Sequence, residues 1–335
     1  MNEIDLAKEV PKQVEELGLD WDIFGVIDQR NNVYSLTYDA KIIGRIFELL
    51  AAPAIRSAAD EHDMEIVPAE SQTIYPDFTL APETEGGLEK GDEILSLAGV
   101  DIDSRDDIEA VIEDEPPDST LQCTVERNSS VTTITVPPSE FNKLAIDVKT
   151  TYREFYSRKY TYPNGDSYEA GDTQPFTFTL GSYASFLRNP TKNIQYDYRA
   201  YARHYIMGFV YTRNGNSEEG LVKDYSDRGE VPPPYQDVEY FVSEKYEIAG
   251  ETPGSGNTEN IGSFRTNNIK DLREGNGPFG EHGEDLFEEY WRNHGRYREE
   301  DKFSSIEEFF EWRENTGDKG EEEGSGEVES KLGDF

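Results

Sequence analysis

The sequence has few cysteines and few basic side chains. Cys123 is the single cysteine among 335 residues, so no disulfide can form within the chain, which is typical of a reducing compartment. Lysine and arginine total 32 against 70 aspartate and glutamate residues, a formal net charge of −38. The chain also lacks a long apolar run, and its acidic N-terminus shows no signal-peptide pattern. We therefore expect a cytoplasmic protein with no membrane partner.

The excess of acid has two possible explanations. Disorder is the usual consequence of high net charge. However, 20 tyrosine and 17 phenylalanine residues, together with regular apolar spacing, argue against disorder for most of the chain. In molar salt the Debye length falls to about 3 Å, so carboxylates repel one another little and a hydrated acidic surface stays soluble. The composition therefore indicates a protein of a halophilic archaeon.

Apolar spacing predicts a mixture of helices and strands. Helices are expected over 2–18 and 40–61, around 291–292 and over 306–312, and strands over 21–28 and 33–38 on either side of a turn. Pro11 and Pro53 should break or kink the first two helices, because proline lacks a backbone donor. Glycine and acidic residues dominate from Glu314 onward, so residues 317–335 are expected to form a disordered acidic tail.

Two β-rich stretches, 75–80 and 145–151, carry side chains suited to phosphodiester hydrolysis. In a strand, Ala145, Asp147 and Lys149 share one face, and the apolar residues between them point to the other. If a neighbouring strand brings Asp77 alongside, two carboxylates can hold a hard cation such as Mg²⁺ next to a lysine. The cation would polarise the phosphate and activate water, and the lysine would place that water or stabilise negative charge. A Pro-Asp followed by Asp-x-Lys is a weak pattern by itself in so acidic a chain.

Several longer strings accompany this pattern. They are IYPDFTL, IDVKTTY, FTLGSYASFLRNPTKNI (178–194), GFVYTR (208–213), IAG-x3-GSGNTENIGS (248–263) and EYWRN (289–293). In order and approximate spacing they resemble the EcoRV-type restriction endonucleases of the PD-(D/E)xK superfamily, from about residue 20 to about 315. The resemblance implies an α/β (α+β) fold in which helices flank a mixed, largely antiparallel central sheet.

This resemblance also implies a reaction. In a type II restriction endonuclease of this kind, Asp77 and Asp147 bind Mg²⁺, Lys149 orients or activates the attacking water, and Glu48 assists metal binding from a helix. Without the resemblance, Glu48 could equally be an ordinary surface glutamate. A homodimer would bind palindromic double-stranded DNA, with one half-site per subunit. The implied site is GATATC, cut bluntly at its flexible central step to leave 5′ phosphates.

The resemblance assigns DNA contacts to two further sets of residues. Base contacts fall on a glycine loop and on one residue before the first catalytic strand: Gly254, Ser255, Gly256, Asn257, Thr258 and Gln72. Contacts to the DNA backbone fall on Lys41, Thr150, Thr151, Ser185, Asn189 and Arg292. Taken alone, the glycine loop is only flexible, because no Gly-Lys-Ser/Thr follows it. Ala40, Thr73 and Glu259 depart from the family's pattern.

The stretch from Asp172 to Asp197 contains no acid between its ends. Arg188 and Lys192 supply positive charge there, and Arg199 and Arg203 follow on an expected helix. We interpret this stretch as part of a DNA-facing wall. The alternative is a basic patch that pairs with the protein's own acidic surface.

Residues 81–143 interrupt the nuclease pattern, which would otherwise occupy 1–80 and 144–316. The run GLEKGDEILSL (87–97) and residues after it resemble the C-terminal half of a PDZ domain, without the glycine loop that grips a peptide C-terminus. The segment holds sixteen acidic and four basic residues, so it should not touch DNA. We predict a stabilising insertion or one that faces an unknown protein partner, with peptide binding as the weaker alternative. Its ends must lie close together to enter a hairpin.

Two other functions remain open. One is a non-specific or repair nuclease on the same fold, which the Gly-Ser-Gly-Asn-Thr loop disfavours. The other is a catalytically idle DNA-binding scaffold, which the intact Asp77, Asp147 and Lys149 disfavour.

Overall fold

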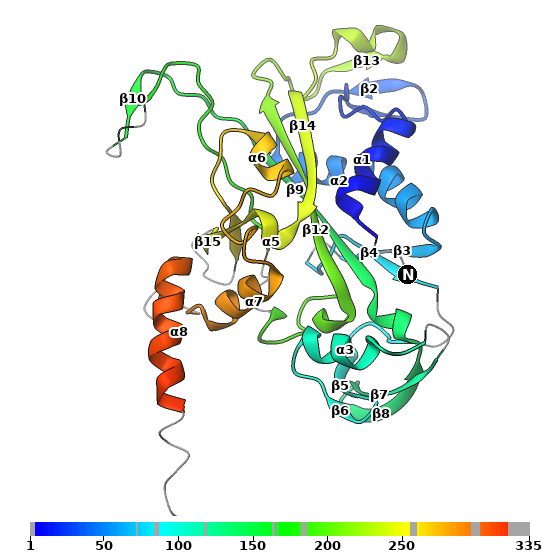
Figure 1. The fold of residues 1–335 in the computed structure, drawn as a ribbon. Coiled ribbons are helices and arrows are strands. Elements are labelled where there is room, and N and C mark those ends of the chain that lie inside the picture. The colour runs from blue at the N-terminus through cyan, green and yellow to red at the C-terminus, as the bar shows by residue number, and fades with distance from the viewer. Residues whose placement is uncertain are drawn as a thin grey trace, which may run out of the picture.

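A five-stranded mixed sheet forms the centre of the computed structural model. The structure describes residues 4–71, 73–83, 87–116, 119–162, 165, 167–181, 186–254, 260–295 and 302–320, with side chains up to residue 316. The strand order is β14-β12-β9-β4-β3, and only the β9–β12 pair is parallel. The bounds are β3 Met64–Pro68, β4 Phe78–Pro82, β9 Lys143–Tyr152, β12 Tyr201–Arg213 and β14 Tyr235–Glu244 (Figure 1).

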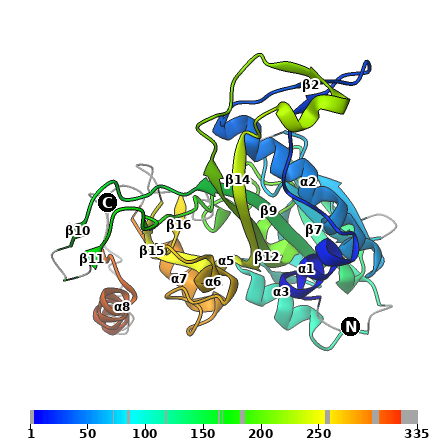
Figure 2. The same ribbon diagram turned by 90° about the horizontal axis from the view of Figure 1, so that it is seen from above.

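Helical layers cover both faces of this sheet (Figure 2). On one face pack α1 (Leu6–Glu16) and α2 (Ala40–Asp60), and on the other α5 (Lys245–Ile248), α6 (Ile269–Arg273) and α7 (Glu284–Asn293). The alternation of β9 explains the division: Ile146 and Val148 lie in the α1/α2 cluster, and Ala145 lies in the opposite one. The predicted fold class is confirmed.

Neither proline interrupts its helix, contrary to the sequence-based expectation. Helix α1 continues through Pro11 and α2 through Pro53. An interior proline costs about 3 kcal/mol. Burying a large apolar side chain contributes about 1.5–3 kcal/mol, and α2 fully buries Phe47 and Ile55 on either side of its proline. Tertiary packing therefore outweighs the local penalty.

The expected helix carrying Arg199 and Arg203 is also wrong. A single 3₁₀ turn, η2 (Tyr198–Ala200), leads directly into β12. The Asp197 carboxylate accepts the Arg199 backbone N–H at 2.9 Å and so caps that turn. The following run of tyrosine, isoleucine, phenylalanine and valine favours a strand because such side chains pack well on a pleated surface.

A second, smaller sheet lies between β4 and β9 in sequence. Its order is β6-β5-β7-β8, with bounds β5 Glu93–Leu97, β6 Val100–Asp101, β7 Leu121–Arg127 and β8 Ser130–Val136, and helix α3 (Arg105–Ile112) packs against it. This segment, residues 87–141, has its own apolar cluster (cyan in Figure 1). Because β4 and β9 are antiparallel neighbours, the whole segment is a long hairpin connection. Its likeness to a PDZ domain stays a prediction.

A buried ion pair joins segment 87–141 to the main body. Asp197 and Arg199 are 1% and 7% exposed, and their side chains meet at 2.6 Å. Asp197 also accepts the Ile94 backbone N–H at 2.9 Å, and Arg199 donates to the Ile94 carbonyl at 2.8 Å and to the Ile102 carbonyl. In return, Arg105 of α3 donates to the Arg199 carbonyl at 3.1 Å. Both side chains of this pair are therefore hydrogen-bonded across the junction.

Short elements complete the described chain. They are β1 Val26–Ile27, β2 Asn32–Tyr34 and β13 Val222–Asp224 in a three-stranded sheet, η1 Pro138–Phe141, η3 Tyr225–Glu230, β10 Tyr160–Thr161 with β11 Ser167–Tyr168, and β15 Ala249–Pro253 with β16 Ile261–Ser263. The predicted turn before β2 has Asn31 at φ 64°. Helix α8 (Ile306–Gly320) enters the predicted tail, and the rest of that tail lies outside the described residues. Within the described parts, no helix is both long and apolar enough to cross a membrane.

Candidate active site

The register between β4 and β9 brings the two predicted metal-binding aspartates together. Phe78 pairs with Ile146, and continuing this antiparallel register by one residue sets Asp77 across from Asp147. The Val148 backbone N–H donates to the Asp77 carboxylate at 2.8 Å, which fixes that side chain at the junction. The two aspartates thus meet although about seventy residues separate them in sequence.

Lys149 completes this group. Its Nζ lies 2.6 Å from the Asp147 carboxylate, and the Lys149 side chain remains 27% exposed while that of Asp147 is only 5% exposed. Asp147 and Lys149 share one face of β9 because they are two residues apart in a strand. The lysine therefore lies at the solvent-facing mouth of the site, and the carboxylate lies deeper.

The charges of these three residues shift one another's pKa. Burial, and next the negative charge of Asp147, raise the pKa of Asp77 to about 8. Burial also works against ionisation of Asp147, but the positive charges of Lys149 and Lys245 outweigh it and lower the pKa of Asp147. Burial opposes the charge of Lys149 as well, yet both aspartates raise its pKa. The cluster therefore favours one additional positive charge, either a proton or a cation.

The donor atoms fit Mg²⁺. A hard cation takes oxygen ligands and keeps several waters, so one or two carboxylates suffice from the protein. Asp77 and Asp147 supply two carboxylates, and burial together with the charge of Asp147 raises the pKa of Asp77, so a cation beside this pair would be favourable. Among the residues that the structure describes, no group of three His, Cys, Asp or Glu is placed to hold a metal ion. The chain would thus provide two ligands and leave the others to water and phosphate.

Glu48 lies near this pair, on α2. It lines a hollow of about 410 Å³ together with Asp77, Glu70 and Ser71, and its negative charge contributes to the raised pKa of Asp77. The Glu48 carboxylate pairs with Arg45 one turn earlier, and its side chain is 16% exposed. Glu48 therefore lies beside the aspartate pair without forming a three-carboxylate group with it among the described residues, and its accessory role stays a prediction.

Lys245 is a residue near the site that the sequence reasoning missed. It is buried on α5, with Nζ 3.9 Å from the centroid of the Tyr75 ring, and its charge reaches Asp147. Burial is the main cause that lowers the pKa of Lys245 to about 7. The Tyr75 hydroxyl meets His204 Nδ1 at 2.8 Å, so this side of the site is a packed layer. The sequence offered no clear signal, because Lys245 lies between Glu244 and Glu247 in a mixed polar and apolar stretch.

The residues predicted to contact DNA fall into three groups. Thr150 and Thr151 follow Lys149 on β9, are half-buried and point to opposite faces. Lys41 and Asn189 are exposed, while Arg292 pairs with Glu288 at 3.5 Å. The remaining predicted contacts lie outside the described residues: Gln72, Ser185, Ser255, Gly256, Asn257 and Thr258.

Gly254 is the one residue of the predicted recognition loop that the structure describes. A Cβ at this position would come within 2.6 Å of the Gly262 Cα across the β15–β16 pair. Glycine is therefore required by the close approach of two backbones at the base of the loop. That requirement is independent of any base contact.

The predicted DNA-facing wall needs a correction at Arg199. This side chain is buried against Asp197 and cannot reach a ligand from solvent. Arg188 donates to the carbonyls of Trp291 and His294 at the end of α7. The two carbonyls that accept from Arg188 are more than a hundred residues away in sequence, so local patterns could not indicate them.

Charge is nevertheless unevenly distributed along the chain. Residues 144–214, from β9 through β12, contain nine basic and six acidic residues, a net charge of +3. The remainder contains 23 basic and 64 acidic residues, a net charge of −41. The catalytic strand thus belongs to the one long stretch of positive balance, which suits a polyanionic ligand.

Comparison with known proteins gives two matches. A family model described as restriction endonuclease EcoRV matches residues 18–90 and 101–314. The type II restriction enzyme EcoRV of Escherichia coli is 33% identical over 297 residues, which cover 87% of this chain and 91% of that protein. The family match includes Asp77, Asp147 and Lys149, and its interruption at 91–100 lies within segment 87–141.

Proposed function

The chain belongs to the EcoRV family of restriction endonucleases, and from this premise we propose that it makes Mg²⁺-dependent, blunt double-strand cuts at GATATC. Membership makes it a type II restriction endonuclease, hence a nuclease that acts on double-stranded DNA. The observation that carries the proposal is the meeting of Asp77, Asp147 and Lys149 at one strand junction. These residues supply the ligands and the cation that phosphodiester hydrolysis requires.

Each side chain has a separate role in the proposed reaction. Asp77 and Asp147 would hold Mg²⁺, which when bound polarises the phosphate and lowers the pKa of water. The Lys149 ammonium, held 2.6 Å from Asp147, orients the attacking water and stabilises developing negative charge. Glu48 assists from the side of the hollow. Water displaces the 3′ oxygen in line, and the 5′ phosphate remains on the product.

Proton binding by Asp77 is part of this mechanism. With its pKa raised to about 8, Asp77 is largely protonated at neutral pH until a cation enters. Carboxylate ligands must be deprotonated to bind metal, so cation binding releases this proton. Val148 N–H keeps the Asp77 carboxylate in place during the exchange.

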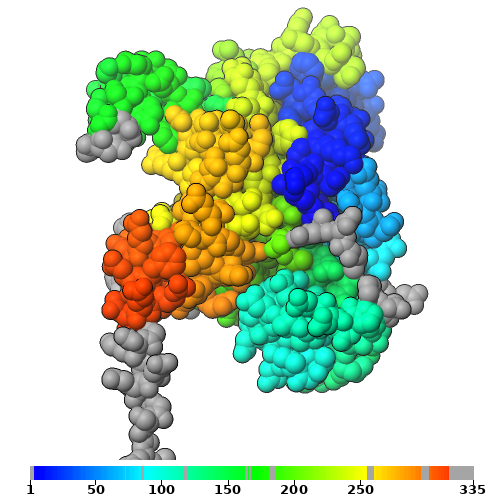
Figure 3. Space-filling view, viewed as in Figure 1, coloured from blue at the N-terminus to red at the C-terminus, as the bar shows by residue number. Residues whose placement is uncertain are grey.

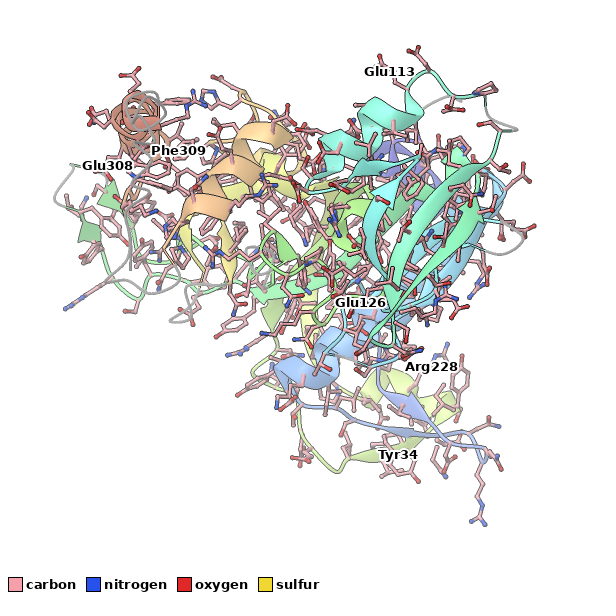
Figure 4. All side chains as sticks on the ribbon, turned by 90° about the horizontal axis from the view of Figure 1, so that it is seen from below. Tyr34, Glu113, Glu126, Arg228, Glu308 and Phe309 are labelled. Carbon is pink, nitrogen blue, oxygen red and sulfur yellow. The ribbon has the colours of Figure 1, made fainter. Side chains whose placement is uncertain are left out.

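A homodimer is supported by an exposed apolar surface. Large apolar side chains lie exposed in and beside the β1-β2-β13 sheet and on α2: Phe24, Val26, Ile27, Tyr34, Tyr38, Ile42, Leu49, Val222 and Tyr225. Figure 4 shows Tyr34 on this sheet and Arg228 on the adjoining η3, in a part of the chain that projects from the body. Exposed apolar side chains of this number favour an interface, and a two-fold dimer would read a palindrome with one half-site per subunit.

The acidic composition of the rest of the chain supports the proposal that the protein works in molar salt, as in the cytoplasm of a halophilic archaeon. At such salt the counterion-release contribution to affinity is small, so base contacts and DNA shape must carry more of it. We expect the slope of log K against log salt to be shallower than about −6. A steeper slope in a filter-binding titration would contradict this expectation.

Segment 87–141 is proposed as a stabilising insertion. Its apolar cluster includes Ala200 of the main body, and the Asp197–Arg199 pair seals the junction. These contacts support an internal role more than recruitment of a separate protein.

One assay tests the proposed function. A plasmid carrying GATATC is incubated with the protein in concentrated KCl and Mg²⁺, beside an Asp147→Ala variant. Discrete fragments from the wild type alone support the restriction enzyme. A smear would indicate a non-specific or repair nuclease, and uncut DNA would indicate a catalytically idle scaffold.

A further inference from the structure

A hairpin arm, residues 153–174, follows β9 in sequence and projects from the body (green in Figures 1 and 3). It begins four residues after Lys149, at the end of β9, and contains the β10–β11 pair. A bridge between Phe155 and Thr173 closes its root. No residue of this arm has a role in the function proposed above.

The root of the arm is joined to the hairpin that carries the predicted recognition loop. Directly after the arm, Phe176 pairs with Thr266 and Thr179 pairs with Gly262. Arg265 adds a hydrogen bond to the Pro175 carbonyl at 3.4 Å. The arm and the β15–β16 hairpin therefore form one substructure, so a ligand at the recognition loop also lies near the arm.

Aromatic stacking within the arm supports its shape. The Tyr156 and Tyr168 rings stack at 4.9 Å, and the Tyr160 and Tyr162 rings meet edge to face at 4.6 Å. The Tyr156 and Tyr162 hydroxyls are hydrogen-bonded at 3.0 Å. Because these contacts are internal to the arm, little ordering would be needed when it meets a ligand, and pre-organisation of this kind favours binding.

The outgoing half of the arm carries two adjacent basic side chains. Between Glu154 and Asp166 there is no acidic residue, whereas Arg158 and Lys159 both lie exposed. Lys159 pairs with Glu169 on the returning strand. The returning half carries Glu169 and Asp172, so the positive charge of the outer part of the arm is confined to its outgoing half, at Arg158 and Lys159.

We propose that the arm binds the phosphate backbone of the duplex flanking the recognition site, through Arg158 and Lys159. The proposal rests on the proposed function, because it assumes that the loop at 254–258 meets DNA. Phosphate contacts of this kind position a protein without reading sequence. A second copy of the chain is the less suitable partner, since the apolar sheet proposed for dimerisation lies on the other side of the molecule from the arm (Figures 1 and 2).

Flank length provides the test. Affinity without Mg²⁺ is measured for a duplex of about one helical turn, roughly 10 base pairs, and for one of about three turns, both centred on GATATC. The proteins are the wild type, the double variant Arg158→Gln/Lys159→Gln, and Lys8→Gln. Lys8 is a matched control because it is an exposed lysine of α1, outside the arm, and also pairs with a carboxylate. Cleavage with Mg²⁺ is measured in parallel.

The wild type and Lys8→Gln should bind the long duplex at least about tenfold more tightly than the short one. The double variant should lose this gain, bind the short duplex normally and cut normally at saturating DNA. The double variant also lacks four cations per dimer, so the slope of log K against log salt on the long duplex should be shallower by about 3 to 4. Glu169→Gln, which frees Lys159 from its pair, should strengthen binding to the long duplex only.

Other results overturn the arm contact. If wild-type affinity does not depend on flank length, the arm does not reach the flank. If the double variant weakens both duplexes equally and dissociates the dimer in sedimentation, the arm binds the second copy instead. A wild type that keeps the flank-length gain but cuts no DNA would refute the proposed function and still support the arm contact.

Discussion

Two buried clusters of charge differ in how completely their charges are balanced. At the Asp197–Arg199 pair, the carboxylate and guanidinium bond to each other and to the backbone of segment 87–141. At the catalytic junction, Asp77 and Asp147 lie side by side, and the pKa of Asp77 is raised to about 8. A balanced buried pair can join two parts of a fold, whereas surplus negative charge prepares a site for a cation.

Neutralising Asp77 should give the largest effect. Asp77→Asn keeps the shape of the side chain but removes a metal ligand, and we expect the single-turnover cleavage rate to fall by about 10³-fold. Stability at neutral pH should stay equal or rise, because the folded variant no longer has to take up a proton at this buried position. Cleavage and urea unfolding are measured on the same preparation. If Asp77→Asn lost stability and kept cleavage, the catalytic junction would be a structural cluster like the Asp197–Arg199 pair, which contradicts the distinction between the two clusters.

Neutralising Asp197 should have the opposite result. Asp197→Asn leaves the Arg199 guanidinium buried without its counter-charge, and breaking a buried pair in this way costs about 3–5 kcal/mol of unfolding free energy. Cleavage below the unfolding temperature should stay within about tenfold of the wild type.

The double variant Asp197→Asn/Arg199→Met is the control for this experiment. It removes both charges and should recover part of the lost stability. No recovery would mean that the pair does not act as a unit.

A comparison of two glutamates in the same hollow isolates the accessory carboxylate. Glu48→Gln should reduce cleavage by about 10–100-fold, as loss of a supporting group near a metal does. Glu70→Gln should leave cleavage unchanged, because Glu70 is 64% exposed and pairs with Lys90 at the surface. Equal losses in both variants would point to the general charge of the hollow rather than to Glu48.

The pH dependence of cleavage should show the smallest of these effects. The folded-state pKa of Asp77, about 8, lies above its ordinary value, so the folded protein binds more protons between about pH 4 and 8. The contribution of Asp77 to the free energy of unfolding is fully present below about pH 4 and is lost as pH rises through about 8. Cleavage at limiting Mg²⁺ should therefore rise up to tenfold per pH unit until about pH 8.

Higher Mg²⁺ should shift this profile to lower pH, because cation and proton compete for Asp77. Asp77→Asn should remove the contribution of this residue to the pH dependence of stability. A wild-type profile that does not move with Mg²⁺ would refute the competition.

Local spacing predicted part of this arrangement. Alternation in β9 placed Asp147 and Lys149 on one face, and the apolar period predicted α2. The pairing of Asp77 with Asp147 depends on a register between distant strands, and it was reached through the family resemblance rather than from spacing. That resemblance is now confirmed by the family match.

The errors share one physical cause. Helix α2 continues through Pro53, Arg199 is buried at a junction, and Lys245 lies beside the site, each because of packing partners far away in sequence. Local propensity contains no information about such partners. The predicted roles of Glu48 and of the DNA-contacting residues remain predictions.

The hairpin topology of segment 87–141 has a consequence for protein engineering. Since the chain leaves and re-enters the central sheet on adjacent strands, a short designed turn could replace the whole segment without altering the order of the sheet. An enzyme that lacks segment 87–141 would then expose Ala200 and the side chains of Asp197 and Arg199 to water. A minimal version of this nuclease should therefore be designed with a resurfaced η2, not only with a shorter loop.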